Sequence, residues 1–273
     1  MAAETRDPAV AGRFYPADPD RIETDLVRYL APPSGAPDQT DALAVVAPHA
    51  GWIYSGAIAG ATYARTRVPD KVVVLCPNHS GLGVRRSLWA AGAWRMPGGD
   101  IPVDAELGQR LQKRAALQPD ALAHLREHAI EVHLPFLRAK NRGFCLVPVC
   151  LGPLSFAECR KLGEALAAVL SEEKERVLIV ASTDMSHYIA ADLAKKLDGL
   201  ALERVTELDA EGLYRVVTTQ EISMCGYIPT TVTLIAARAL GARRATLVRY
   251  GNSGETSGDY ASVVGYAGLV VTD

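Results

Sequence analysis

The stretch LAVVAPHAGW at residues 43–52 joins a short apolar run directly to a histidine and a glycine. An apolar run of this length, bounded by proline and glycine, is typical of a buried strand. Similar runs recur along the chain. Together they predict strands over residues 42–47, 71–76, 144–150, 176–181 and 245–250.

Helical patterns separate these strands. After a first short helix that starts at the Asp18–Pro19 N-cap signal, the sequence predicts helices over residues 56–66, 104–116, 127–140, 156–171, 190–207 and 229–240. Residues 31–41 read as a surface loop, and residues 260–272 predict a last strand, interrupted at Gly265 and Gly268. The alternation predicts one α/β domain over residues 1–273, with a central mostly parallel or mixed sheet covered by helices on both faces.

The composition limits the possible functions. The chain has 273 residues, 49% of them hydrophobic, and a formal net charge of -2, so its overall charge favours neither nucleic acid nor an anionic membrane as a partner. Residues 1–10 lack the apolar run of a secretory signal, and no later run reaches the roughly 18 residues of a membrane helix. Five cysteines without a CxxC pair are typical of reduced thiols, so a cytoplasmic location is expected.

Histidines follow three of the predicted strands or strand-like runs. His49 comes after LAVVA, His79 after VVVLC and His187 shortly after VLIVAS. In open α/β sheets, ligands bind outside the carboxyl ends of the strands. A lone histidine at such a place is usually a loop cap, but three of them predict a common site for metal binding or proton transfer.

Other candidates are more ambiguous on sequence alone. Cys225, just before the Pro229 helix, is either a metal-binding thiolate or an inert buried thiol, and the other cysteines read as core residues. Glu127, His128 and Glu131 lie at a predicted helix start, where they either reach the pocket rim or stay solvated. His124 is predicted to lie on the surface.

Two further motifs point to weaker alternatives. Ser186 lies next to His187 and near Asp184, but a catalytic triad crowded into four residues and without a GxSxG elbow is a poor model for a hydrolase. The glycine-rich segment 251–259 lacks the spacing and the lysine of a phosphate-binding loop. We therefore expect it to be a turn that borders the site.

Seven motifs in a fixed order resemble the MEMO family, including its bacterial members called AmmeMemoRadiSam system protein B. They are AGRFYPADP, APHAGWIYSG, CPNHSG, EHAIEVHLPFL, STDMSHY, CGYIPTT and YGNSGETSGD, and they span nearly the whole chain. The resemblance implies a fold similar to the class III extradiol dioxygenases, the LigB-like group of non-haem iron enzymes.

The resemblance also implies a metal pocket. Its ligands would be His49, His79 and Cys225, and Asp184 and His187 would lie nearby as the groups that orient and transfer a proton. Around them we expect four further pocket residues, namely Trp52, Asn78, Glu127 and His128. This match raises Cys225 above its reading as a buried thiol.

One departure from the dioxygenases concerns the third ligand. Where those enzymes have a carboxylate, this chain has the thiol of Cys225, which leaves iron as the first choice of metal and copper or zinc as alternatives. The leading functional prediction is a metal-dependent, dioxygenase-like oxidoreductase that acts on a small molecule. The alternative is a metal- or peptide-binding adaptor without turnover, because eukaryotic relatives are known as motility effectors that bind receptor-derived phosphopeptides. The bacterial family name implies radical-SAM and AMMECR-type proteins as partners.

Overall fold

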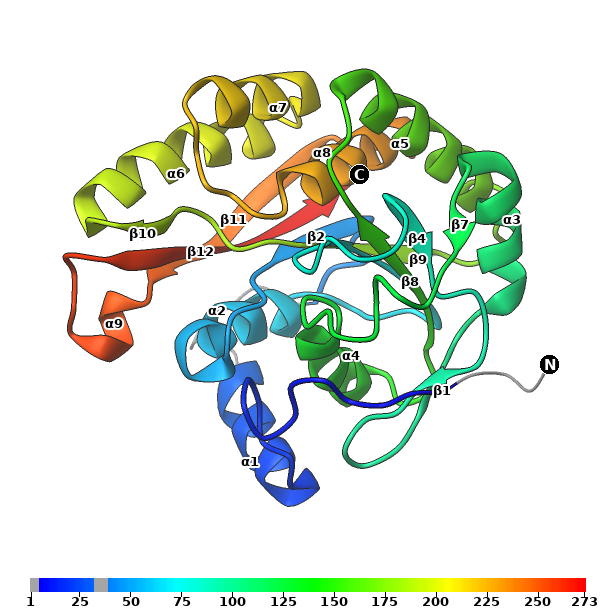
Figure 1. Ribbon diagram of the computed structural model, residues 1–273, viewed down its shortest axis with the longest axis horizontal. Helices are drawn as coiled ribbons and strands as arrows, with labels where there is room; N and C mark the ends of the chain where they lie inside the picture. The colour runs from blue at the N-terminus through cyan, green and yellow to red at the C-terminus, as the bar shows by residue number, and fades with distance from the viewer. Residues whose placement is uncertain (1–4, 32–38) are drawn as a thin grey trace.

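The computed structural model describes residues 5–31 and 39–273, which fold around a large mixed sheet (Figure 1). Its centre is formed by four parallel strands in the order β2 (Ala44–Ala47), β9 (Val177–Ser182), β3 (Lys71–Pro77) and β8 (Cys145–Leu151). Their runs of valine, leucine and isoleucine are buried, as strands covered on both faces require. The predicted α/β class with a mixed sheet is thereby confirmed.

Antiparallel strands extend this centre at both edges. On one side β12 (Val263–Thr272) pairs with β2 and carries β10 (His187–Ile189) and β11 (Arg244–Asn252). On the other side β4 (Arg86–Leu88) pairs antiparallel with β8 and parallel with β7 (Gln118–Pro119). A small second sheet joins β1 (Thr5–Arg6), β5 (Ala93–Trp94) and β6 (Ile101–Pro102).

Helices cover the two faces of the sheet (Figure 1). One face packs against α1 (Pro19–Leu30), α2 (Trp52–Ala64) and α4 (Leu134–Lys140). The other packs against α3 (Ala105–Ala115), α5 (Phe156–Leu170), α6 (Ala191–Thr206), α7 (Ala210–Thr219) and α8 (Tyr227–Ala239). Alternation along β2 divides its side chains between the two cores, since Val45 and Ala47 face the first group and Ala44 and Val46 the second.

The helix starts follow local capping chemistry. The Asp18 side chain accepts a hydrogen bond from the backbone of Asp20, with Pro19 in the first turn of α1. Ser155 and Glu158 form a reciprocal capping box on α5. None of the helices in the described part of the chain is long and apolar enough to cross a membrane.

Two helix predictions were inaccurate. The helix expected over residues 127–140 begins later, as a short 3-10 turn, η1 (Glu131–His133), that leads into α4. The Glu127 carboxylate accepts hydrogen bonds from the backbone of Ala129 and of His79, which holds residues 127–130 in a non-helical turn. Helix α7 was not predicted, although Asp209 caps it.

The predicted interruption of the last strand was also wrong, because β12 runs unbroken through Gly265 and Gly268. The register shift lies instead on its partner β11, between Leu247 and Arg249. A side chain at Gly268 would overlap the Thr62 hydroxyl of α2, so this glycine permits close packing of helix on strand. The segment 251–259 contains a short helix, α9 (Gly254–Ser257), and most of the predicted 31–41 loop, residues 32–38, lies outside the described residues.

Candidate metal centre

The carboxyl ends of the central strands bring three histidines together. His49 follows β2, His79 follows β3, and His128 lies in the turn before η1. Each offers a nitrogen, and these three atoms all lie within 4.8 Å of one another. The ring centroids of His79 and His128 are 4.8 Å apart, and that of His49 lies 5.1 Å from His79 and 5.3 Å from His128. This cluster can hold a metal ion.

Glu127 organises two of the three imidazoles. Its buried carboxylate lies 2.9 Å from Nδ1 of His79 and 3.4 Å from Nδ1 of His128, and it also accepts the backbone N–H of His79 at 2.8 Å. A carboxylate only accepts hydrogen bonds, so His79 Nδ1 carries a hydrogen, and in the neutral ring Nε2 keeps the lone pair. Metal-binding histidines typically show this arrangement.

His49 is held by a different set of groups. Its Nδ1 lies 2.7 Å from the hydroxyl of Ser182, and its Nε2 lies 3.3 Å from Sγ of Cys225 and 3.9 Å from the Asp184 carboxylate. The side chain is 2% exposed. Ser182 was not a predicted site residue, although it ends β9 and is the first residue of the STDMSHY motif.

Asp184 and Cys225 lie side by side at the same edge. The Asp184 carboxylate accepts the backbone N–H of His49 at 2.8 Å and of Ala50 at 3.3 Å, and its own N–H points to Cys225 Sγ at 3.3 Å. Cys225, predicted as a metal ligand, thus lies next to His49. Cys225 is not part of the three-residue ligand cluster. Among the described residues, that cluster consists of His49, His79 and His128.

His187 is oriented by Ser223, a residue that the sequence did not single out. The backbone N–H of His187 donates to Ser223 Oγ at 2.8 Å, and its Nδ1 lies 2.9 Å from the Ser223 carbonyl oxygen. A carbonyl only accepts, so Nδ1 of His187 carries the hydrogen and Nε2 the lone pair. Asp184, expected to orient His187, instead receives backbone hydrogen bonds from His49 and Ala50.

Burial and charge set the protonation of the cluster. Burial lowers the pKa of His49 well below its ordinary value, helped by the neighbouring imidazoles, and burial lowers the pKa of His128 to about 4. For His79, burial also lowers the pKa, but the hydrogen bond and charge of Glu127 outweigh it and the net pKa is raised. Burial raises the pKa of Asp184 to about 6, and burial together with the Asp184 charge raises that of the Cys225 thiol.

The two remaining predicted pocket residues support neighbouring segments. The Trp52 indole packs on Phe136 and donates to the Val132 carbonyl at 3.1 Å. The Asn78 side chain accepts from Ser80 Oγ and the Gly81 N–H, which shapes the loop directly after β3 that carries His79. Trp52 therefore belongs to the packing between α2 and α4, and Asn78 positions the His79 loop.

An N-terminal strap, residues 5–15, closes over this region. Arg6 pairs with Glu131 at 2.8 Å, both side chains being almost fully buried, and Glu131 also accepts from the backbone of Ala9 and Val10 and from the Tyr15 hydroxyl. These bonds fix the strap so that the Phe14 ring lies 4.7 Å from the His128 ring. Glu131, predicted to reach the pocket rim or solvent, instead anchors the strap.

Comparison with known proteins finds the same family that the seven motifs resemble. The family model described as Memo-like protein matches residues 6–270. A MEMO1 family protein of Methanopyrus kandleri is 41% identical over 277 residues, which cover 97% of this chain and 98% of that protein. One from Aquifex aeolicus is 40% identical over 268 residues, with coverage of 97% and 98%. The chain belongs to the MEMO family.

A solved structure supports the fold of this MEMO family member. The crystal structure of an uncharacterised protein from Escherichia coli K12 matches with a TM-score of 0.52 and 15% sequence identity, covering 84% of this chain and 99% of that one. At this level of identity the likeness concerns the fold alone.

His124 of this MEMO protein corrects one sequence prediction. We expected it on the surface, but it is fully buried, with its ring 6.0 Å from that of Trp94 and 6.2 Å from that of Trp89. Neither ring nitrogen has a hydrogen-bond partner among the described residues. Burial, helped by the nearby charge of Arg6, lowers the pKa of His124 to about 3, so the ring stays neutral between the two tryptophans. The sequence around His124, ALAHLREH at residues 121–128, gives no sign of the two tryptophans that cover the ring in the fold.

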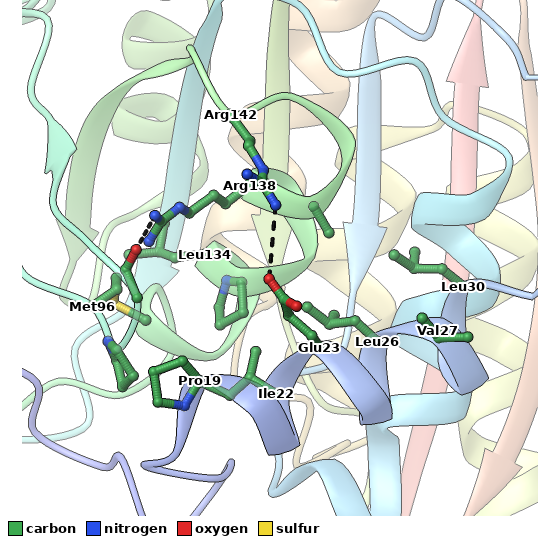
Figure 2. A pocket seen from close by; sticks show the side chains of 14 residues that line it. Pro19, Ile22, Glu23, Leu26, Val27, Leu30, Met96, Leu134, Arg138 and Arg142 are labelled. Carbon is green, nitrogen blue, oxygen red and sulfur yellow. Dashed lines mark hydrogen bonds and ion pairs between the residues drawn. The ribbon is translucent and has the colours of Figure 1, made fainter.

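A separate hollow of the MEMO fold lies between α1 and α4, with a volume of about 500 Å³. Figure 2 shows Ile22, Leu26 and Leu30 of α1 facing Leu134 across it. We call it the α1–α4 groove. Arg138 at its edge donates to the Gly98 and Gly99 carbonyls, and Arg142 pairs with Glu23 at 3.7 Å. No histidine is among the described residues that line it.

Proposed function

We propose that the pocket binds a redox-active metal ion, iron first and copper second, and uses it in oxidoreductase chemistry similar to that of the extradiol dioxygenases. The observation that carries the proposal is the convergence of His49, His79 and His128, with their three candidate ligand atoms within 4.8 Å of one another. Imidazole nitrogen suits iron, copper and zinc alike. The choice of iron rests on the family resemblance.

The donor set fits such an ion. Burial keeps His49 and His128 neutral, and a neutral imidazole is the form that binds metals. Cys225 Sγ, 3.3 Å from His49 Nε2, is the further donor implied by the family motif, and coordination would replace its thiol proton. When bound, the metal would supply electron transfer and polarise a ligand at a position that the protein leaves open.

His187 supplies the proton acceptor in this proposal. Its hydrogen bond to the Ser223 carbonyl leaves the Nε2 lone pair available, as a general base requires. The backbone bonds from His49 and Ala50 hold the Asp184 carboxylate beside the cluster, where it favours positive charge on the surrounding imidazoles. The substrate would be a small molecule with an acidic proton, such as a catechol.

An anaerobic titration identifies the ligands. Fe(II), Cu(I) and Zn(II) are added separately to wild type, His128→Ala and Cys225→Ser, with Cys159→Ser as the matched control because Cys159 is a buried thiol of α5. Loss of a ligand should weaken binding by at least about 10 to 100-fold. A loss confined to His128→Ala gives a three-histidine site, and one confined to Cys225→Ser gives two histidines and a cysteine. If both variants bound all three metals as tightly as the wild type does, the proposed metal centre would be refuted.

Turnover is tested by oxygen uptake with catechol-like compounds. His187→Ala should keep its metal and lose oxygen consumption, as expected for a base that is not a ligand. Metal binding without any oxygen uptake in the wild type would favour the alternative, a metal- or peptide-binding protein without turnover.

A further inference from the structure

A chain of buried hydrogen bonds runs from helix α2 to the histidine cluster. The Tyr63 hydroxyl lies 3.1 Å from Nδ1 of His133, and Nε2 of His133 lies 2.9 Å from Oγ of Ser182. Ser182 Oγ in turn lies 2.7 Å from Nδ1 of His49. All four residues are at most 1% exposed, so water does not compete for these bonds.

The direction of this chain follows from the Ser182 hydroxyl, which has one hydrogen and two lone pairs. Its oxygen lies 2.6 Å from the carbonyl oxygen of Ala129. Two oxygens approach this closely only when a hydrogen lies between them, and a carbonyl has none to give. Ser182 therefore donates to Ala129, and both imidazoles that contact Ser182 must donate to it.

The geometry points to Ser182 as the positioning residue that fixes the tautomer of His49. With its hydrogen on Nδ1, His49 presents the lone pair of Nε2 to the pocket, on the side of Cys225 and Asp184. In the same way His133 carries its hydrogen on Nε2, so its Nδ1 accepts the Tyr63 hydroxyl. The whole chain is satisfied in one pattern only, and that pattern is set by the carbonyl of Ala129.

This pattern gives Ser182 the role for His49 that Glu127 has for His79. In each case an acceptor binds Nδ1–H and leaves Nε2 free, but Ser182 is neutral and Glu127 is charged. A neutral acceptor orients the ring without favouring its protonated form, which suits a fully buried histidine. The consequence for metal binding rests on the proposed function, whereas the tautomer itself does not.

The tautomers can be read directly from metal-free protein. In long-range ¹H–¹⁵N spectra of ¹⁵N-histidine-labelled wild type, His49 should show a protonated Nδ1 and a bare Nε2, and His133 the reverse. His49→Gln and His133→Gln spectra assign the signals. A wild-type His49 that carries its hydrogen on Nε2 would overturn the inference, and this outcome requires no variant at the serine.

Ser182→Ala tests the cause. Without the oxygen, His49 should populate both neutral tautomers, and the affinity for Zn(II), used as a redox-inert probe, should fall by about 10 to 100-fold. Ser182→Thr keeps the hydroxyl. It should therefore restore the single His49 tautomer and the wild-type affinity for Zn(II). Unchanged tautomers of His49 in Ser182→Ala would show that Ser182 does not set them.

Two controls separate this role from a merely structural one. Ser87→Ala removes another buried serine that donates to a backbone carbonyl, that of Asp120, and should leave the His49 tautomer and zinc affinity unchanged. Tyr63→Phe removes the far end of the chain and should also leave His49 unchanged, because Ala129 and not Tyr63 sets the direction. A His49 tautomer that switches in Tyr63→Phe would overturn the assignment. If wild type binds none of Fe(II), Cu(I) and Zn(II), the proposed metal centre fails while the spectra still decide the tautomer.

Discussion

The histidine cluster and the α1–α4 groove meet at one short stretch of chain, but the cluster is formed by polar side chains and the groove by mostly apolar ones. His133 points into the buried polar chain beside His49, whereas Leu134 and Pro135, the next two residues, line the groove. The groove offers about 500 Å³ and mostly aliphatic walls. The cluster instead offers three imidazoles whose ring nitrogens are oriented by buried acceptors.

The difference shows that the volume of a hollow does not indicate which chemical groups line it. Apolar walls bind whatever fits them, but only polar groups held in fixed directions can select an ion or move a proton. Keeping such groups buried requires a complete set of partners, because an unpaired buried charge or N–H is costly. Variants of the cluster should therefore be sensitive to partner loss and to pH, and variants of the groove should not.

The largest effect is expected at the anchor of the strap. Glu131→Ala would leave the Arg6 guanidinium buried without its carboxylate and would remove the acceptor of two backbone N–H groups. Breaking such a pair should lower the free energy of unfolding by about 3–5 kcal/mol. Urea denaturation measures this loss. A change below about 1 kcal/mol, within the range of exposed ion pairs, would mean that the strap contributes little.

Removing the acceptor behind His79 and His128 should have the next largest effect. Glu127→Ala frees the Nδ1 atoms of both rings, so their Nε2 atoms lose a fixed orientation. Zinc affinity should fall by about 10 to 100-fold, which is roughly 1.4–2.7 kcal/mol. Isothermal titration measures it, with Glu173→Ala as control, because Glu173 is a mostly buried carboxylate paired with Lys71. Equal affinities in the two variants would contradict the role of Glu127.

The pH dependence of stability should distinguish the two regions. His128, His133 and His124 have pKa values of about 4, 3 and 3 in the fold, against about 6.5 when unfolded. The unfolded chain therefore binds more protons, and stability is lost as pH falls from about 6.5 toward about 4. Asp184, with its pKa raised to about 6, acts in the opposite direction, since its ionisation at higher pH opposes folding.

The net effect is a loss on acidification, on the order of 1 to 2 kcal/mol for each neutral buried histidine at about pH 5. Urea denaturation of the metal-free protein at about pH 7 and about pH 5 measures it. His124→Phe should reduce the difference, because phenylalanine has no proton to take up. Leu26→Ala in the groove should lower stability by the same amount at both pH values. A loss in Leu26→Ala that depends on pH would break the comparison.

The smallest effect is expected at the rim of the groove. Val27 is 76% exposed on α1, so Val27→Ser should change the free energy of unfolding by less than about 0.5 kcal/mol. Zinc affinity should equal that of the wild type. A weaker zinc affinity in this variant would show that the groove and the cluster are coupled.

The sequence was sufficient for features that depend on periodicity. Apolar runs located the central strands, and the residues directly after β2 and β3 included two members of the cluster. His128 was predicted only as a rim residue, because its turn is held by the Glu127 carboxylate, a contact with residues far away in sequence. Local pattern alone therefore suggested a helix.

Sequence patterns did not predict the roles of three residues, namely Ser182, Ser223 and His133. A serine at a strand end and a histidine near a helix start are common, and their roles follow only from the rings and carbonyls that the fold places beside them. The burial of His124 has the same explanation, since it depends on Trp89 and Trp94 from another segment. The roles of such residues depend on tertiary contacts, which the local sequence does not show.

The strap has a consequence for the order in which the chain folds. Arg6 and its carboxylate partner are separated by 125 positions, and no nearer acidic side chain is paired with Arg6 within the described residues. During synthesis the amino-terminal segment emerges first, yet its anchor does not exist until residue 131 has been made. The contact is thus among the long-range ones that a chain forms late. Residues 5–15 therefore leave the ribosome well before their anchor and can close over the histidines only after residue 131 has been made.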